Sequence, residues 1–174
     1  MTTTLYTKEQ IQIRIQELAK EIMSDYNGQS VLLVSILKSS FVLTADLVRA
    51  LYEAGMKTVD VDFIQISSYG TAKQSSGDPQ IVADLTVAIK DKHVLIVEDI
   101  IDTGHTLKFV KKLLEDRSPA SFKILAFLDK KEQREVQVTV DYVGFTLTGS
   151  PWVEGYGMDG GEFGRGRPEI AEKK

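Results

Sequence analysis

Residues Val94–Leu107 form the stretch VLIVEDIIDTGHTL, an apolar run that ends in carboxylates and a Thr-Gly turn. The apolar half, 94–97, is typical of a buried strand in a parallel sheet with both faces covered. Glu98, Asp99 and Asp102 follow that run, ahead of a helical pattern. Ligands of open α/β sheets lie beyond the carboxyl ends of the strands, so this stretch predicts both the fold class and the edge that carries the site.

Apolar periodicity predicts alternating helices and strands along the rest of the chain. We expect helices at residues 8–26, 41–54 and 106–115, and strands at 31–37, 59–66, 81–89, 94–97, 121–128 and 140–145. Thr7 and Gln10 match a capping box at the start of the first helix. This alternation favours an α/β sheet with a parallel core. We expect a turn at Asp91–His93, irregular backbone after Gly149, and one domain over residues 1–174.

Composition excludes several classes of protein. The chain has 174 residues, 43% hydrophobic and 26% charged, which suits a globular domain with a substantial core. A net charge of -4 argues against a chain-wide basic field for nucleic acid. The chain has no cysteine, which excludes disulfides and thiolate metal sites. The first residues do not resemble a signal peptide, and no apolar run approaches the ~20 residues of a membrane span, so we expect a cytoplasmic protein without membrane partners.

The opening stretch combines groups that suit a sugar phosphate. A glycine-containing turn at a helix N-terminus offers backbone N–H groups and the positive end of the helix dipole to a phosphate. Thr103 and Thr106 add hydroxyl donors. The carboxylates of Glu98 and Asp99 suit sugar hydroxyls, directly or through a hydrated Mg²⁺. The alternative is that the acids only complement the helix dipole, but one acid would be enough for that.

This stretch resembles the phosphoribosyl pyrophosphate (PRPP) binding motif of type I phosphoribosyltransferases, and within them most closely the hypoxanthine-guanine phosphoribosyltransferases. The resemblance extends from about residue 5 to about residue 170. Glu-Asp followed by Asp-Thr-Gly after an apolar strand is far more specific than a lone Gly-x-Gly. The resemblance implies a mostly parallel sheet flanked by helices, with a small hood subdomain built from the N- and C-terminal segments.

The resemblance also implies roles for the residues of the motif. Glu98 and Asp99 would bind the ribose hydroxyls, and the loop 102–106 would hold the 5′-phosphate, which involves Asp102, Thr103, Gly104, His105 and Thr106. Asp102 would face the purine as its catalytic acid or base, because the purine must lose an N–H proton as it attacks C1′. His105 departs from the family's usual Lys, Asn or Leu. We interpret it as surface variation, with a phosphate contact as the alternative.

Two further segments resemble the pyrophosphate-binding parts of the family. Lys38 and Ser39 lie where the family has Leu-Lys-Gly, with a Leu-Lys peptide that is often cis and a backbone that holds pyrophosphate. Ser39 departs from the usual glycine, and the alternative for Lys38 is a solvated loop lysine. Arg165 matches the pyrophosphate-binding arginine. Asp159 would hold Mg²⁺ that carries pyrophosphate oxygens, with Glu98 and Asp99 as further candidate ligands.

The Ser- and Gly-rich segment 67–80 is long for a connection in a compact domain. Its Ser68 and Tyr69 match the Ser-Tyr of the family's mobile lid, which would exclude water from an oxocarbenium-like transition state. The alternative is an unordered hairpin tip.

The purine-binding segments complete the resemblance. Lys130 would donate to O6 of the base, and because lysine is only a donor it would select 6-oxopurines over adenine. Trp152 would stack on the purine, with a core aromatic as the alternative. Val153 would offer its carbonyl to the guanine amino group. Glu154 replaces a usual valine, so it either changes the purine preference or faces solvent.

The expected function is therefore transfer of 5-phosphoribose from PRPP to N9 of hypoxanthine or guanine, giving IMP or GMP and pyrophosphate, with Mg²⁺. A preference for xanthine and a non-catalytic regulator that binds PRPP or a nucleotide are the alternatives. The resemblance also implies a homodimer or homotetramer.

Overall fold

The structure is a computed structural model that describes residues 2–67, 79–159 and 163–173. Its elements in chain order are β1 (Thr2–Tyr6), α1 (Lys8–Tyr26), β2 (Val31–Leu37), α2 (Phe41–Glu53), β3 (Val59–Ser67), β4 (Gln80–Ala83), β5 (His93–Ile101), α3 (His105–Glu115), β6 (Ser121–Asp129), the 3₁₀ turn Lys131–Gln133, β7 (Tyr142–Thr146), β8 (Val153–Glu154) and β9 (Ile170–Lys173). Among the described residues, no helix has the length and apolar character needed to cross a membrane.

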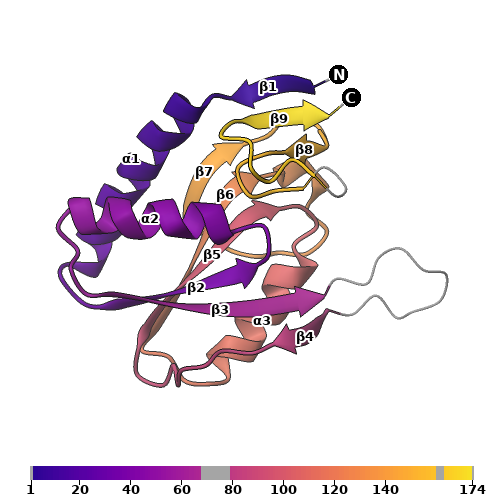
Figure 1. Cartoon of the computed structure of the whole chain (residues 1–174). Helices are drawn as coiled ribbons and strands as arrows, with labels where there is room; N and C mark the ends of the chain where they lie inside the picture. Colours follow the sequence, from indigo (N-terminus) through magenta and orange to yellow (C-terminus); the bar gives the residue numbers. More distant parts are fainter. Residues whose placement is uncertain (1, 68–78, 160–162, 174) are drawn as a thin grey trace.

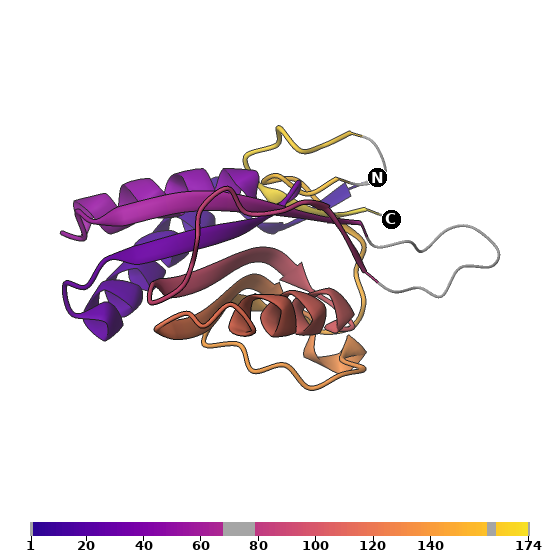
Figure 2. The same ribbon diagram turned by 90° about the horizontal axis from the view of Figure 1, so that it is seen from below.

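A six-stranded sheet forms the centre of the molecule, in the order β4-β3-β2-β5-β6-β7 (Figure 1). All neighbouring strands are parallel except β3 and β4, which are antiparallel. Helices α1 and α2 cover one face and α3 covers the other, as the view from below shows (Figure 2). This arrangement confirms the predicted α/β class with a parallel core, and it places the carboxyl ends of β2, β5 and β6 at one edge.

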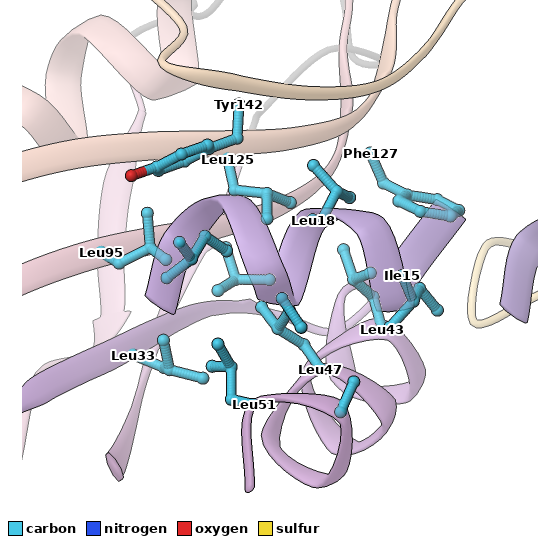
Figure 3. Packing of buried hydrophobic residues seen from close by; sticks show 14 of the residues in the cluster. Ile15, Leu18, Leu33, Leu43, Leu47, Leu51, Leu95, Leu125, Phe127 and Tyr142 are labelled. Carbon is cyan, nitrogen blue, oxygen red and sulfur yellow. The ribbon is translucent and has the colours of Figure 1, made fainter. Parts of the chain in front are cut away.

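Two apolar clusters explain why the central strands are continuously hydrophobic. Successive residues of a strand point to opposite faces, so Leu33 joins the cluster under α1 and α2 while Leu32 joins the cluster under α3. Figure 3 shows the first cluster, in which Leu18 of α1 and Leu47 of α2 meet Leu95 of β5. Both faces of the central strands β2, β5 and β6 are largely buried, which fixes the register of β5 and the position of the polar residues at its end.

The predicted ends of the helices lie within one residue of the observed ends. Thr7 Oγ1 accepts from the Gln10 N–H at 3.3 Å, and Gln10 Oε1 accepts from the Thr7 N–H at 2.9 Å, which confirms the capping box. Asn27 closes α1 in the left-handed conformation. Helix α2 ends at Glu53, one residue earlier than predicted, and Gly55 follows with φ of +108°.

The strand predicted at 81–89 is wrong beyond residue 83. The N–H groups of Thr86 and Val87 donate to the Asp62 carboxylate at 2.7 and 3.0 Å, so they are not available to a strand ladder. Asp84 pairs with Arg117 at 2.7 Å, which turns the chain away from the sheet edge. A buried side chain on β3 therefore overrides the strand propensity of this segment.

Strand β5 is longer than predicted, because it runs from His93 to Ile101. His93 begins the strand and is not part of a turn. Glu98 and Asp99 lie within the strand, where the prediction placed them after it. Parallel pairing with β6 continues to Ile101, which holds the backbone of both acids in place.

The tail after Gly149 is not irregular throughout, which corrects the prediction. Strands β8 and β9 join β1 in a second sheet of three strands, in the order β1-β9-β8. The first and last strands lie side by side in both views (Figures 1 and 2). This small sheet, which we call the hood, is built from the N- and C-terminal segments, as the family resemblance implied.

Candidate active site

The turn between β5 and α3 is the segment predicted to hold a phosphate, and it lines a small cavity. Gly104 caps α3 with φ of +91°, and a side chain there would meet the Val136 carbonyl oxygen at 3.1 Å, so glycine is required. The Thr103 carbonyl accepts N–H groups from Glu135 at 3.0 Å and Val136 at 3.2 Å, which hold the turn from behind. A cavity of about 100 Å³ is lined by Glu98, Ile100, Ile101, Asp102, Thr103, Gly104, Thr106 and Leu107. The cavity lies at the N-terminus of α3, and backbone N–H groups at a helix N-terminus can bind an anion.

His105 does not line this cavity. Its Nε2 lies 2.8 Å from Glu135 Oε2, and both side chains are more than half exposed. The structure therefore agrees with the interpretation of His105 as surface variation.

The two acids of β5 are held in an unusual electrostatic state. Asp99 is only 5% exposed, and Glu98 Oε2 is buried with no hydrogen-bond partner among the described residues. Burial raises the pKa of Asp99 to about 6, against the opposing effect of Glu98 and of backbone N–H donors. Burial, and then the negative charge of Asp99, raises the pKa of Glu98 well above its ordinary value. These oxygens are suited to hydroxyl donors or to a cation brought by a ligand.

Asp102 and Lys130 meet beside this turn. Lys130 Nζ lies 3.4 Å from Asp102 Oδ2, with the lysine side chain 8% exposed and the aspartate side chain 49% exposed. Pairing of β5 with β6 brings them together, because Ile101 lies opposite Asp129 and the Lys130 N–H donates to the Ile101 carbonyl at 3.0 Å. Asp102, the predicted acid or base, thus lines the cavity and contacts Lys130, the predicted donor to the purine.

The predicted pyrophosphate residues Ser39 and Arg165 contact each other, together with Asp159. Arg165 donates to Ser39 Oγ at 3.2 Å and to the Gly157 carbonyl at 2.7 Å, and it forms an ion pair with Asp159. Its positive charge also acts to lower the pKa of Asp99, which places it near β5. The serine that departs from the family's usual glycine therefore takes part in this cluster.

Lys38 is exposed, and the peptide bond from Leu37 to Lys38 is cis, as in the family pattern. Gly157 is a residue that the sequence analysis missed. Its φ is +94°, and a side chain there would collide with the Ser39 carbonyl oxygen. Glycine at this position lets the hood approach the backbone after β2.

Of the predicted purine-binding residues, Val153 lies in the hood and Trp152 directly precedes it, whereas Lys130 follows β6. Trp152 is 61% exposed, which excludes the alternative of a core aromatic. Val153 is buried in β8, paired opposite Glu172 of β9. Glu154 is buried and pairs with Arg167 at 2.6 Å, so the alternative that it faces solvent is wrong.

Comparison with known proteins agrees with this geometry. The phosphoribosyl transferase domain model matches residues 1–159. The chain is 44% identical over 167 residues to a hypoxanthine-guanine phosphoribosyltransferase of Aquifex aeolicus, with 95% of this chain and 91% of that protein covered. It is 41% identical over 171 residues to a hypoxanthine-guanine phosphoribosyltransferase of Dictyostelium discoideum, with 98% and 94% covered.

The chain belongs to the phosphoribosyltransferase family. The structure of the Trypanosoma cruzi hypoxanthine phosphoribosyltransferase in complex with the product IMP is also similar, with a TM-score of 0.90 and 40% identity over 98% of this chain and 93% of that chain. The resemblance and the fold class expected from the sequence are thus confirmed, and this phosphoribosyltransferase is an enzyme.

The residues proposed for Mg²⁺ do not form one cluster in this phosphoribosyltransferase. Within residues 2–67, 79–159 and 163–173, no group of three or more His, Asp or Glu side chains is placed to hold a metal. Asp159 is already paired with Arg165. Mg²⁺ commonly keeps several waters and binds through one or two carboxylates plus substrate phosphates. The carboxylates of Glu98 and Asp99, one with an unpartnered buried oxygen, fit that mode.

Ser68 and Tyr69, and most of the expected lid at 67–80, lie outside the described residues. A hollow of about 390 Å³ at the amino ends of β2, β3 and β5 contains none of the predicted site residues. The described residues predicted for the site instead lie at or beyond the carboxyl ends of the strands, or in the segment that precedes β9.

Sequence analysis missed several supporting contacts. Asp129 is buried and pairs with Arg134, whose side chain lies under Gly104. Arg167 is a second hood arginine, paired with Glu154. Each contact joins segments whose pairing is not visible in a single sequence, and only the unusual Glu154 was a signal.

Proposed function

We propose that this phosphoribosyltransferase moves 5-phosphoribose from PRPP to N9 of hypoxanthine or guanine, giving IMP or GMP and pyrophosphate in purine salvage. The 3.4 Å contact between Lys130 and Asp102 at the mouth of the phosphate cradle carries the proposal. It presents a cation for O6 and a carboxylate for a ring N–H of the same base. The relatives described above are named for hypoxanthine or guanine, which gives no support to a xanthine-preferring enzyme or a non-catalytic regulator.

The proposed roles follow from the geometry of the two sides of the site. The α3 N-terminus, with Thr103 and Thr106, binds the 5′-phosphate through N–H and O–H donors. Glu98 and Asp99 accept the ribose hydroxyls. Asp102 accepts the purine proton as the base attacks C1′, and Lys130 donates to O6 and favours the 6-oxo form.

The hood supplies the remaining contacts in this proposal. Trp152 stacks on the purine face, and the Val153 carbonyl accepts from the 2-amino group of guanine. Arg165, with the backbone at Lys38 and Ser39, holds the pyrophosphate. Mg²⁺, when bound with PRPP at Glu98, Asp99 or Asp159, neutralises negative charge on the pyrophosphate.

A steady-state assay with PRPP, Mg²⁺ and each purine in turn tests the proposed function. Turnover is expected with hypoxanthine or guanine and not with adenine, because Lys130 is only a donor. Turnover confined to xanthine, or nucleic-acid binding without any turnover, would overturn the proposal.

The variant Lys130→Ala separates the purine role from PRPP binding. We expect kcat/KM for the purine to fall about 100-fold or more, with the Kd of PRPP within about twofold. Lys131→Ala is the matched control, because Lys131 is the next residue and is exposed. Equal losses for purine and PRPP would assign Lys130 to structure.

A homodimer or homotetramer and a cytoplasmic location are further proposals from the resemblance. Light scattering after size-exclusion chromatography tests the first, and cell fractionation tests the second.

A further inference from the structure

Glu154 is an unusual residue for its place in the hood. Its side chain is 12% exposed, and its Oε1 accepts from Arg167 Nη1 at 2.6 Å. Arg167 also pairs with Glu169 at 3.1 Å and donates to Thr2 Oγ1 at 3.4 Å. The pair thus joins a buried carboxylate to a guanidinium whose side chain is 38% exposed.

The partner of Glu154 lies on the same turn as the pyrophosphate arginine. The Arg167 N–H donates to the Gly164 carbonyl at 3.0 Å, which closes a turn with Arg165 inside it. The two guanidinium groups have different partners: Arg165 contacts Ser39 and Asp159, while Arg167 contacts Glu154. Fixing Arg167 therefore fixes the backbone that carries Arg165.

The other end of the pair lies on the strand that carries the purine contacts. Glu154 directly follows Val153 in β8, and Trp152 precedes them. Two backbone bonds add to the connection, from Tyr156 N–H to the Arg167 carbonyl at 2.8 Å and from Gly157 N–H to the Arg165 carbonyl at 3.0 Å. The ion pair thus joins the purine half of the hood to its pyrophosphate half.

We propose that Glu154 and Arg167 are positioning residues that set the place of Arg165 relative to Trp152 and Val153, and so align pyrophosphate and purine for transfer. The inference rests on the proposed function. A charged pair with a planar guanidinium fork has a preferred geometry, whereas apolar contacts of similar volume fill space without specifying direction. Replacing both members of a desolvated ion pair with apolar residues is often neutral for stability, and here only Glu154 is buried, so positioning can be separated from folding.

The experiment compares wild type with Glu154→Gln, Arg167→Lys and the double variant Glu154→Val/Arg167→Leu. The double variant is expected to unfold at nearly the wild-type temperature, while its KM for PRPP and for the purine rise about tenfold because the two binding groups lose their alignment. Glu154→Gln and Arg167→Lys are each expected to raise both KM values less than the double variant does, because each single variant keeps a hydrogen bond between residues 154 and 167. Pyrophosphate affinity, measured by calorimetry, should fall in parallel.

Arg117→Gln is the matched control, because it breaks the exposed Asp84–Arg117 pair outside the site and should leave both KM values unchanged. A double variant with wild-type KM values and wild-type pyrophosphate affinity would overturn the inference. KM changes that follow the loss of thermal stability across all variants would overturn it as well. Absence of turnover in the wild type would instead overturn the proposed function, and calorimetry would still report on the pair.

Discussion

Two buried aspartates on the strands that flank β2 show opposite electrostatic behaviour. Asp62 in β3 and Asp99 in β5 are each 5% exposed. Asp62 accepts N–H groups from Phe63, Thr86 and Val87 and the hydroxyl of Thr86. Burial acts to raise its pKa, but these donors outweigh burial and the pKa lies below its ordinary value. At Asp99 burial prevails, and the pKa is raised to about 6.

The difference separates a carboxylate whose charge the fold satisfies from one whose charge the fold satisfies only in part. The chain itself supplies donors to Asp62, so that charge is satisfied before any ligand arrives. Beside Asp99, the buried Oε2 of Glu98 has no partner among the described residues. Unsatisfied buried charge lowers stability, and perturbed carboxylates of this kind occur preferentially at functional sites. Exposure alone does not distinguish the two aspartates, whereas their donors do.

The largest expected effect comes from the exposed acid beyond β5. Asp102→Asn should lower kcat by about 100-fold or more, because the amide cannot accept the purine proton, a role typically worth about 10²–10⁴-fold. The Kd of PRPP should change little, since backbone N–H groups make the phosphate cradle. Rapid-quench kinetics and fluorescence titration measure the two quantities. An unchanged kcat would remove Asp102 from the acid or base role. Asp102 would then be, like Asp62, a carboxylate that serves the fold.

The next effect is a loss of stability at the structural aspartate. Asp62→Asn should lower the free energy of unfolding by about 2 kcal/mol near pH 7, because charge-assisted hydrogen bonds to Thr86 and Val87 are lost. Asp62 has a lowered pKa, so its contribution is present above the unfolded value and declines as the pH falls below about 4. Urea denaturation at several pH values should show the two proteins converging in acid.

Asp60→Asn is the matched control, because Asp60 is exposed on the same strand and accepts only the Val61 N–H among the residues that the structure describes. The KM values of Asp62→Asn should match the wild type. A stability loss that is independent of pH would mean that the shape of Asp62, and not its charge, holds Thr86 and Val87 against β3.

Asp99→Asn is expected to change stability in the opposite direction. Because the folded pKa is raised, the folded state binds a proton more tightly than the unfolded chain, so ionising Asp99 lowers stability as the pH rises from about 4 through about 6. The amide avoids this cost and should gain on the order of 1 kcal/mol near pH 7, a gain absent near pH 4. PRPP should bind more weakly. If Asp99→Asn is destabilised at pH 7 as Asp62→Asn is, the distinction between the two aspartates fails.

These cases also show what a single sequence reveals. The β5 motif was predictable because the residues from Glu98 to Thr106 are contiguous, and periodicity in a sheet covered on both faces gave the central strands. The Thr86 N–H donates to Asp62, which lies on a different segment of the chain. Local periodicity does not reveal this bond, so the strand predicted at 81–89 was wrong beyond residue 83.

The hood was the least predictable part for the same physical reason. Pairing of β1 with β9 joins the two ends of the chain, and the contact of Arg165 with Ser39 spans most of its length. Neither short strand has enough local periodicity to identify it. Only the family resemblance indicated these roles in advance, because conformations set by distant partners leave little local signal.

The smallest expected effect lies at His105, because its pair with Glu135 is exposed whereas Asp62 and Asp99 are buried. His105 and Glu135 are paired at 2.8 Å with side chains 52% and 64% exposed. Exposed pairs of this kind contribute about 0–1 kcal/mol, so His105→Asn should leave the thermal midpoint and the KM for PRPP almost unchanged, within about twofold. Glu135→Gln is the matched control, since it breaks the same pair from the other side. A tenfold rise in the KM for PRPP in His105→Asn alone would mean that the imidazole contacts the phosphate, whereas equal, small changes in both variants would leave binding to the backbone N–H groups at the start of α3.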